Sequence, residues 1–184
     1  MKLIIIEGTD NTGKDTLISK LLEKFPTSTI IHCGKPCSKQ YSGNEQDALF
    51  EVYANNIVNG AYGNTHVIIM NRSHIGEYVY GVLYRGRDKE DVKKMIWNID
   101  NYLKEYCDVY YVQLLCSSEF LLAKNEDEKS LSNGNAEKIE IEKSKFLEIF
   151  NESKLNKKLV WVNEDDHFRP VNDIFNEVWK FVNK

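Results

Sequence analysis

The sequence predicts an α/β fold of three layers, in which helices cover both faces of a five-stranded parallel sheet. Two observations support this prediction. Five short apolar segments rich in β-branched residues alternate with longer amphipathic ones, the order typical of right-handed strand–helix–strand units. Several of these segments are apolar at successive positions, as in Ile4–Ile6 and Val67–Met70. A strand that is apolar on both sides is buried on both sides, which requires helices above and below the sheet.

The elements follow one another regularly along the chain. The predicted strands are Lys2–Glu7, Thr29–Cys33, His66–Asn71, Asp108–Cys116 and Lys158–Asn163. Amphipathic spacing predicts helices over Lys14–Lys24, Glu45–Asn59, Ile75–Tyr84, Lys89–Tyr106, Glu119–Asn125, Ala136–Ser153 and Val171–Asn183. Residues 125–135 (NEDEKSLSNGN) are polar, which predicts either a solvated surface loop or a lid over a site. Because no repeat or linker divides the chain, residues 1–184 are expected to form one domain.

Composition narrows the classes of partner. The formal net charge of the 184-residue chain is -4. Proteins that bind the nucleic-acid backbone usually present a strongly basic face, so the charge argues against a nucleic-acid partner. No apolar run approaches the roughly 20 residues that a membrane span needs, and the first residues lack the features of a secretory signal. We therefore expect a cytoplasmic protein without a membrane partner.

The most specific local pattern is the segment KLIIIEGTDNTGKDT, in which a buried strand leads into a glycine-bounded turn and then a helix. Glycines let backbone N–H groups turn toward phosphate groups, and the helix N-terminus adds its positive dipole end. The pattern predicts that ATP binds to a loop formed by Gly8, Thr9, Asp10, Asn11, Thr12, Gly13, Lys14, Asp15 and Thr16. The ammonium group of Lys14 would reach the β- and γ-phosphates.

The residue after Lys14 departs from the usual motif. A Ser or Thr normally follows this Lys, and its hydroxyl binds Mg²⁺. Here Asp15 follows, and Thr16 comes next. Because carboxylates are natural Mg²⁺ ligands, we expect Asp15 and Thr16 to hold the metal, directly or through water. If the glycines only form a turn, both residues would instead cap the helix.

Arg72 follows the third predicted strand. The carboxyl ends of parallel strands meet at one edge of the sheet, so Arg72 should enter the same crevice as the phosphate loop. A guanidinium group there can bind a phosphate through two parallel hydrogen bonds. An ion pair within the protein is the alternative.

These two motifs together resemble a known family. EGTDNTGK resembles the E-G-x-D-x-x-G-K loop of thymidylate kinases, and NRSHIGEYVYG resembles their D-R-x-x-x-S-x-x-x-Y segment. The combination is most similar to bacteriophage-type thymidylate and deoxynucleoside monophosphate kinases. The resemblance implies a P-loop kinase fold and an enzyme that uses ATP and Mg²⁺ to phosphorylate a nucleoside monophosphate. It also implies a homodimer through Glu45–Ala61 and Lys89–Tyr106, whose periodicity fits equally well with faces that pack on the sheet.

The resemblance assigns roles to individual residues. Lys14, Asp10 and Arg72 would be catalytic, with Asp10 near the sugar hydroxyl or the Mg²⁺ waters and Arg72 on the α-phosphate of the acceptor. Tyr80 would lie beneath the deoxyribose and leave little room for a 2′-hydroxyl, while Glu77 would help to read the base. The alternatives are a core aromatic side chain for Tyr80 and an exposed helix residue for Glu77.

Two departures from the family affect the charge of the site. Asn71 replaces the Asp that precedes the Arg in the family, and residues 125–135 contain no Arg although the family's lid is rich in it. We therefore expect Lys124 on the lid, and Arg85, to supply part of the positive charge on the phosphates. A Lys neutralises charge but cannot bind a phosphate with the two-pronged geometry of Arg.

Two other functions remain compatible with the motifs. A deoxynucleoside kinase, or a kinase of a modified-pyrimidine hydroxyl, would need a carboxylate base beside the hydroxyl group. Glu7 is a candidate, but its place at the end of the first strand favours a buried role. A nucleotide-binding protein without catalysis would explain Asn71 and the lid without Arg, whereas the presence of both Lys14 and Arg72 argues against it.

Overall fold

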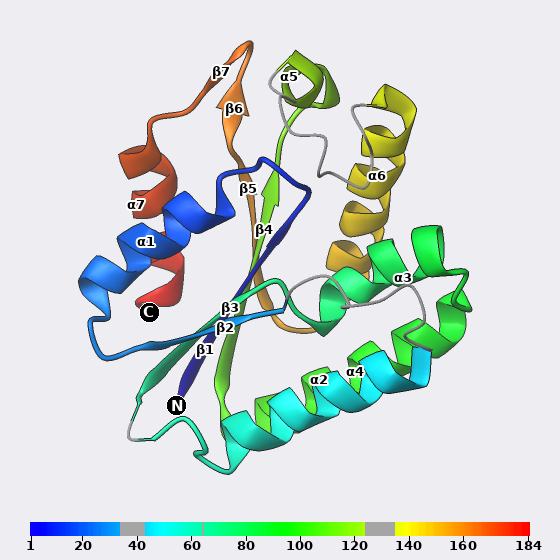
Figure 1. Ribbon diagram of the computed structural model, residues 1–184. Coiled ribbons are helices and arrows are strands. Elements are labelled where there is room, and N and C mark those ends of the chain that lie inside the picture. The colour runs from blue at the N-terminus through cyan, green and yellow to red at the C-terminus, as the bar shows by residue number, and fades with distance from the viewer. Residues whose placement is uncertain (34–42, 64, 124–134) are drawn as a thin grey trace.

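The computed structural model describes residues 1–33, 43–63, 65–123 and 135–184. Five strands form an all-parallel sheet in the order β2-β3-β1-β4-β5. They are β1 (Lys2–Gly8), β2 (Thr29–His32), β3 (Val67–Asn71), β4 (Asp108–Leu115) and β5 (Asn156–Trp161). Figure 1 shows helices on both sides of this sheet. The predicted three-layer fold is therefore confirmed.

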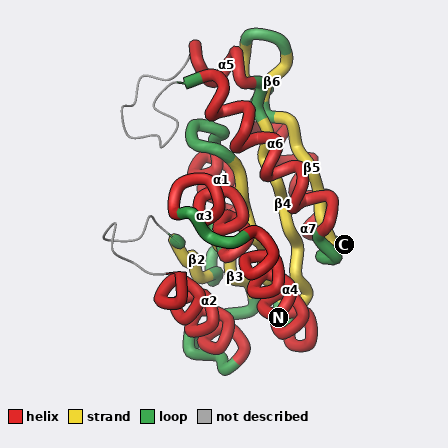
Figure 2. Tube along the Cα trace, turned by 90° about the vertical axis from the view of Figure 1, so that its right-hand side faces the viewer, coloured by secondary structure: helices red, strands yellow, loops and turns green. Residues whose placement is uncertain are grey.

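The helices lie close to the predicted ranges. They are α1 (Lys14–Lys24), α2 (Gly43–Val58), the 3₁₀ turn η1 (His74–Gly76), α3 (Glu77–Arg85), α4 (Lys89–Tyr106), α5 (Ser118–Ala123), α6 (Ala136–Glu152) and α7 (Val171–Val182). On one face of the sheet α1 packs against α7, and on the other α2 and α3 pack against α4 (Figure 2). Within the described ranges, no helix has the length and apolar character needed to cross a membrane.

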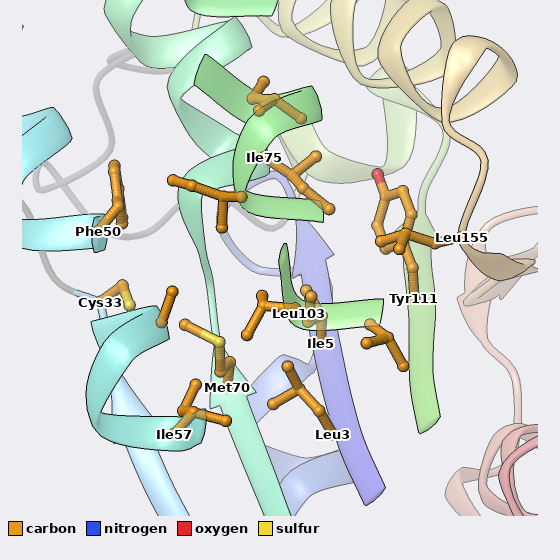
Figure 3. Packing of buried hydrophobic residues seen from close by; sticks show 14 of the residues in the cluster. Leu3, Ile5, Cys33, Phe50, Ile57, Met70, Ile75, Leu103, Tyr111 and Leu155 are labelled. Atoms are coloured by element: carbon orange, nitrogen blue, oxygen red, sulfur yellow. The ribbon is translucent and has the colours of Figure 1, made fainter. Parts of the chain in front are cut away.

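The central strand β1 explains why both faces are covered. Leu3 and Ile5 enter the cluster under α2 and α4 (Figure 3), whereas Ile4 and Ile6 enter the cluster under α1 and α7. All four side chains are fully buried. Each such burial contributes about 1.5–3 kcal/mol, which a sheet with one open face would lose for half of them. Because β1 lies between β3 and β4, its end delivers Gly8 to the middle of the carboxyl edge, where ligands bind in this class of fold.

A short antiparallel hairpin, β6 (Asn163–Glu164) and β7 (His167–Phe168), was not predicted. The sequence analysis extended the fifth strand to Asn163, whereas β5 ends at Trp161. The side chain of Asn163 turns the chain because its amide donates to the carbonyl oxygen of Asp165, which has a positive φ of 51°. The side-chain oxygen of Asn163 also accepts from the backbone N–H of Ser117 at 2.9 Å, which ties the hairpin to the end of β4.

Candidate active site

The loop between β1 and α1 has the backbone geometry that its glycines predict. Gly8 has a φ of 157° and Gly13 a φ of 77°. A Cβ atom on Gly8 would lie 2.8 Å from the carbonyl oxygen of Leu114 and 2.8 Å from the hydroxyl oxygen of Thr12. A side chain there would therefore collide with β4, so the loop can pass this close only as glycine. Asn11, at a φ of 62°, adds a further left-handed residue that turns the loop.

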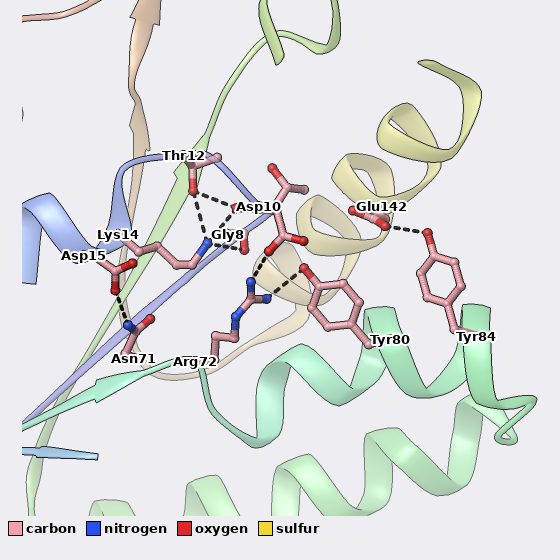
Figure 4. Close-up of polar contacts among 11 residues, drawn as sticks. Gly8, Asp10, Thr12, Lys14, Asp15, Asn71, Arg72, Tyr80, Tyr84 and Glu142 are labelled. Carbon is pink, nitrogen blue, oxygen red and sulfur yellow. Dashed lines mark hydrogen bonds and ion pairs between the residues drawn. The ribbon is translucent and has the colours of Figure 1, made fainter. Parts of the chain in front are cut away.

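Lys14, the first residue of α1, lies buried inside this loop. Its Nζ donates hydrogen bonds to the carbonyl oxygens of Gly8 at 3.0 Å and Thr9 at 2.6 Å (Figure 4). Burial, together with the nearby Arg72 guanidinium, lowers the pKa of Lys14 to about 8. The ammonium group is thus held at the centre of the loop by neutral acceptors, which charged phosphate oxygens could replace.

Arg72 meets the phosphate loop across the sheet edge, as its position after β3 predicts. Its guanidinium forms an ion pair with Asp10, and its Nη1 donates to the hydroxyl of Tyr80 at 3.0 Å. The guanidinium carbon lies 5.3 Å from the centre of the Tyr80 ring. Arg72 has a positive φ of 66°. Its backbone N–H donates to the carbonyl oxygen of Ile6 at 3.0 Å, which holds the residue in this conformation. A residue in this sparsely populated conformation marks a position that the surrounding structure determines.

Tyr80 is the buried aromatic side chain that its alternative description predicts, and its place beneath a deoxyribose stays a prediction. It is largely buried, and its ring packs edge-on against Phe146 with the ring centres 5.9 Å apart. Burial raises the pKa of its hydroxyl, which therefore stays protonated and can donate a hydrogen bond. The ring thus belongs to a small apolar cluster, while its hydroxyl accepts from Arg72 in the crevice.

Glu7 is fully buried and has a structural set of partners. Its Oε1 accepts from the hydroxyl of Ser73 at 2.8 Å and from the backbone N–H of Gly76 at 3.2 Å. Burial raises the pKa of this carboxyl group. Glu7 therefore joins the end of β1 to the segment that directly follows Arg72, which agrees with the buried role that its sequence position favours.

Glu142 on α6 belongs to the site but was not identified from the sequence. Its side chain is buried and accepts a hydrogen bond from the Tyr84 hydroxyl (Figure 4). Burial raises its pKa; Asp10 raises it further, whereas Arg72 and Lys14 lower it, so all three charges reach this carboxyl group. The signal in the sequence is a glutamate within the apolar stripe of α6, where neighbouring turns bury Ile139 and Phe146.

Glu77 and Arg85, both predicted to contact the substrate, are paired with each other. Glu77 is buried rather than exposed, and it forms ion pairs with Arg85 and, at 3.2 Å, with Arg87. Arg87 in turn binds Asp47 through both of its terminal nitrogens, at 2.7 and 2.6 Å. Gly81 makes room for this network because a Cβ there would collide with Oε1 of Glu77. The network joins the two ends of α3 to α2.

Asp15 and Thr16 are exposed in the first turn of α1. One carboxylate oxygen of Asp15 accepts a hydrogen bond from the side-chain amide of Asn71 at 2.6 Å. In the part of the chain that the structure describes, no group of three or more His, Cys, Asp or Glu side chains could hold a metal. Mg²⁺ usually takes one or two protein ligands and completes its shell with phosphates and water. The hard oxygens of Asp15 and Thr16 at the loop fit that donor set.

A cavity of about 160 Å³ lies beside the phosphate loop. Its walls come from the loop and α1 on one side and from the hairpin and α7 on the other: Thr12, Gly13, Thr16, Leu17, Leu114, Val162, Phe168, Arg169, Val171 and Ile174. Arg169 is held there by the carbonyl oxygen of Trp161 at 2.6 Å and by Glu177 at 3.1 Å. The sequence does not reveal this cavity, because the hairpin that closes it carries no clear strand pattern.

One predicted part of the site is not described by the structure. Lys124 and residues 125–134 of the predicted lid lie outside the described residues, which resume at Asn135, the N-cap of α6.

Comparison with solved structures places the fold among P-loop kinases. YorR of Bacillus subtilis, in complex with phosphorylated GDP, has a TM-score of 0.71 at 17% identity over 99% of this chain and 96% of its own. The thymidylate kinase of Candida albicans has a TM-score of 0.65 at 18% identity, covering 99% and 91%. That of Ehrlichia chaffeensis has a TM-score of 0.63 at 13% identity, covering 97% of each. No protein-family model matches the sequence, and no curated protein matches it. These likenesses show that the chain has the three-layer P-loop kinase fold.

Proposed function

We propose that this protein is an ATP-dependent nucleoside monophosphate kinase that acts on thymidylate or another deoxynucleoside monophosphate. The observation that carries the proposal is the meeting of two cationic groups from different loops in one crevice. Lys14 lies within the phosphate loop, and the Arg72 guanidinium is close enough to lower the pKa of Lys14. A phosphoryl-transfer site needs such an arrangement, with one cation for the donor phosphates and another for the acceptor phosphate. The fold shared with thymidylate kinases supports the proposal.

The donor half of the site consists of the loop and the neighbouring cavity. The loop amides and Lys14 would bind the ATP phosphates, and the largely apolar cavity beside Thr12 would take the adenine ring against Phe168. Asp15 and Thr16 would hold Mg²⁺. When bound, this ion neutralises charge on the β- and γ-phosphates.

The acceptor half lies between η1, α3 and α6. Arg72 would bind the monophosphate, and its existing bond to Tyr80 aligns the guanidinium for that contact. The Tyr80 ring and the carboxyl groups of Asp10 and Glu142 would surround the sugar. Because Glu77 is already paired with Arg85, it would act on the base only if the substrate displaces or shares that ion pair.

A monophosphate oxygen is already a competent nucleophile, so the protein needs mainly to align the two substrates and screen the transferred charge. Glu7 contributes by holding the segment that follows Arg72 against the end of β1. The lid over residues 125–135, the contribution of Lys124, a homodimer and a cytoplasmic location stay predictions.

Glu142 favours a second candidate function, the phosphorylation of a nucleoside or modified-pyrimidine hydroxyl. That reaction needs a carboxylate to accept the hydroxyl proton, and a raised pKa suits a general base near neutral pH. Glu142 is buried, has a raised pKa and is influenced by Asp10 and Arg72. Glu7 suits this role less well, because it is completely buried and two hydrogen bonds, from Ser73 and Gly76, hold it at the end of β1.

One assay separates these functions. The purified protein is incubated with ATP, Mg²⁺ and a panel of ribo- and deoxynucleoside monophosphates and nucleosides. The proposal expects deoxynucleoside diphosphates to form, no product with Lys14→Ala, and a KM for the monophosphate at least about tenfold higher with Arg72→Lys, which keeps charge but loses the paired hydrogen bonds. Phosphorylation of nucleosides alone, abolished by Glu142→Gln, would establish the hydroxyl kinase. ATP binding without transfer to any acceptor would overturn both and leave a nucleotide-binding protein.

A further inference from the structure

We propose that Asp15 and Asn71 act as a coupled pair. Asp15, on α1, presents its carboxylate to the metal, and the side-chain amide of Asn71, at the end of β3, positions that carboxylate. The usual motif has a neutral hydroxyl after the Lys, and the family that the sequence resembles has an Asp at the position of Asn71. In this chain the acidic and neutral side chains have exchanged positions. The inference rests on the proposed ATP–Mg²⁺ site and adds a positioning role for Asn71.

The geometry brings the two side chains together from separate elements. Asn71 is the last residue of β3 and pairs in register with Ile6 of β1 and His32 of β2, so it stands at the carboxyl edge of the sheet. Its Nδ2 lies 2.6 Å from Oδ1 of Asp15, which is 56 residues away in sequence (Figure 4). This hydrogen bond fixes the direction of the Asp15 carboxylate in the first turn of α1.

The Asp15 carboxylate determines which way the Asn71 amide points, and His32 is a second neighbour of the same nitrogen. Nδ2 of Asn71 also lies 3.3 Å from Nδ1 of His32. A side-chain amide nitrogen has two N–H groups, so Asn71 can donate to the carboxylate and to the ring nitrogen at once. The reversed amide would place its oxygen against the Asp15 carboxylate, where two acceptors would repel each other. Asn71 therefore uses one oxygen of Asp15, and the other oxygen remains for Mg²⁺ or one of its waters.

The charge of the pair explains why the two positions must change together. With Asp15 and Asn71 the pair carries one negative charge. An Asp at position 71 would place two carboxylates at hydrogen-bond distance, and such carboxylates cannot both ionise without strong repulsion. A Ser at position 15 would leave no carboxylate for the metal, and it would offer the Asn71 amide only a shorter, uncharged acceptor. A pair with a single carboxylate therefore provides a ligand for the metal and avoids repulsion between the two side chains.

Four proteins test this coupling: the wild type, Asp15→Ser, Asn71→Asp and the double variant. Binding of a non-hydrolysable ATP analogue is measured by calorimetry with and without Mg²⁺, and melting temperatures are measured without nucleotide. Asp15→Ser should reduce the Mg²⁺-dependent gain in affinity by about 10–100-fold, the range found when groups that support a metal site are removed. Asn71→Asp should weaken metal-free binding and lower the melting temperature. The double variant should regain most of both losses.

The control for an added carboxylate is Asn98→Asp, at an exposed position on α4, which should change neither measurement. Multiplicative effects in the double variant, with no recovery of the Mg²⁺ gain or of the melting temperature, would overturn the coupling while the nucleotide site stands. Failure of the wild-type protein to bind the analogue, with or without Mg²⁺, would overturn the coupling together with the proposed function.

Discussion

Nucleotide binding should weaken as the pH rises past 8, because Lys14 loses its charge in the unliganded protein. Burial and the neighbouring Arg72 lower the pKa of Lys14 to about 8, and its partners in the loop are neutral oxygens. The phosphates of ATP would bring negative charge to Nζ and raise that pKa again. The charged form of Lys14 is thus favoured by binding. The affinity is therefore fully present below about pH 8 and is lost as the pH rises through that value.

The size of the effect follows from the pKa. With a value of about 8, Lys14 is about 90% charged at pH 7 and about 10% charged at pH 9. If the charged form alone binds the phosphates, the affinity falls about tenfold between these pH values, which is about 1.4 kcal/mol. The terminal phosphate of the nucleotide titrates near pH 6 and is ionised throughout this range. Binding at pH 9 should consequently take up about one proton per nucleotide.

Calorimetry with a non-hydrolysable ATP analogue measures both quantities. Titrations at pH 7, 8 and 9 give the affinity, and buffers with different ionisation enthalpies give the proton uptake. Lys14→Arg is the matched control because a guanidinium stays charged over this range, so its affinity, although lower, should not change with pH. A wild-type affinity that is equally constant, without proton uptake, would refute the inference that a partly neutral Lys14 binds the phosphates.

Three further substitutions test the loop, the acceptor side and the cavity. Gly8→Ala places a Cβ 2.8 Å from the Leu114 carbonyl oxygen and should lower the free energy of unfolding by about 1–3 kcal/mol and abolish nucleotide binding. Gly63→Ala is the control, because Gly63 also has a positive φ, of 76°, but a Cβ there meets open space. If denaturant melts show equal losses of stability for both variants, backbone strain explains the effect and the collision at Gly8 does not. Glu142→Gln should raise the KM for the monophosphate about tenfold with little change in kcat, since a hydrogen bond to a charged group contributes about 1.5–3 kcal/mol. If steady-state kinetics show instead that kcat falls, Glu142 acts as a general base. Phe168→Ala should weaken ATP binding about 3–10-fold in calorimetry, as expected for the loss of an aromatic contact of about 0.5–1.5 kcal/mol. An unchanged affinity would exclude Phe168 from the adenine site.

The layers of the fold and the phosphate loop could be predicted because they depend on local properties. Continuous apolar runs such as Ile4–Ile6 require burial on both faces, and the structure places alternate residues of β1 in separate clusters. Gly8 and Gly13 allow backbone angles that other residues rarely adopt, and both have positive φ. The position of Arg72 at the edge of the sheet follows from its place directly after β3.

The pairings within the site could not be predicted, because they join residues that are distant in sequence. A periodic pattern shows that α6 has a buried side, but not that this side brings Glu142 beside Asp10 and Arg72. Likewise, the sequence indicates that Glu77 and Arg85 are each available to a substrate, whereas in the fold they form an ion pair with each other.

The sequence by itself determined the strand–helix order, the three layers and the loop that defines this fold, since backbone sterics and hydrophobic burial act within each segment. Tertiary structure decided which charges meet. The Asp15–Asn71 hydrogen bond and the Asp10–Arg72 ion pair each depend on the side-by-side order of β1 and β3. That order is set by the packing of the whole sheet. Electrostatic contacts depend on distances in space, which no single segment encodes.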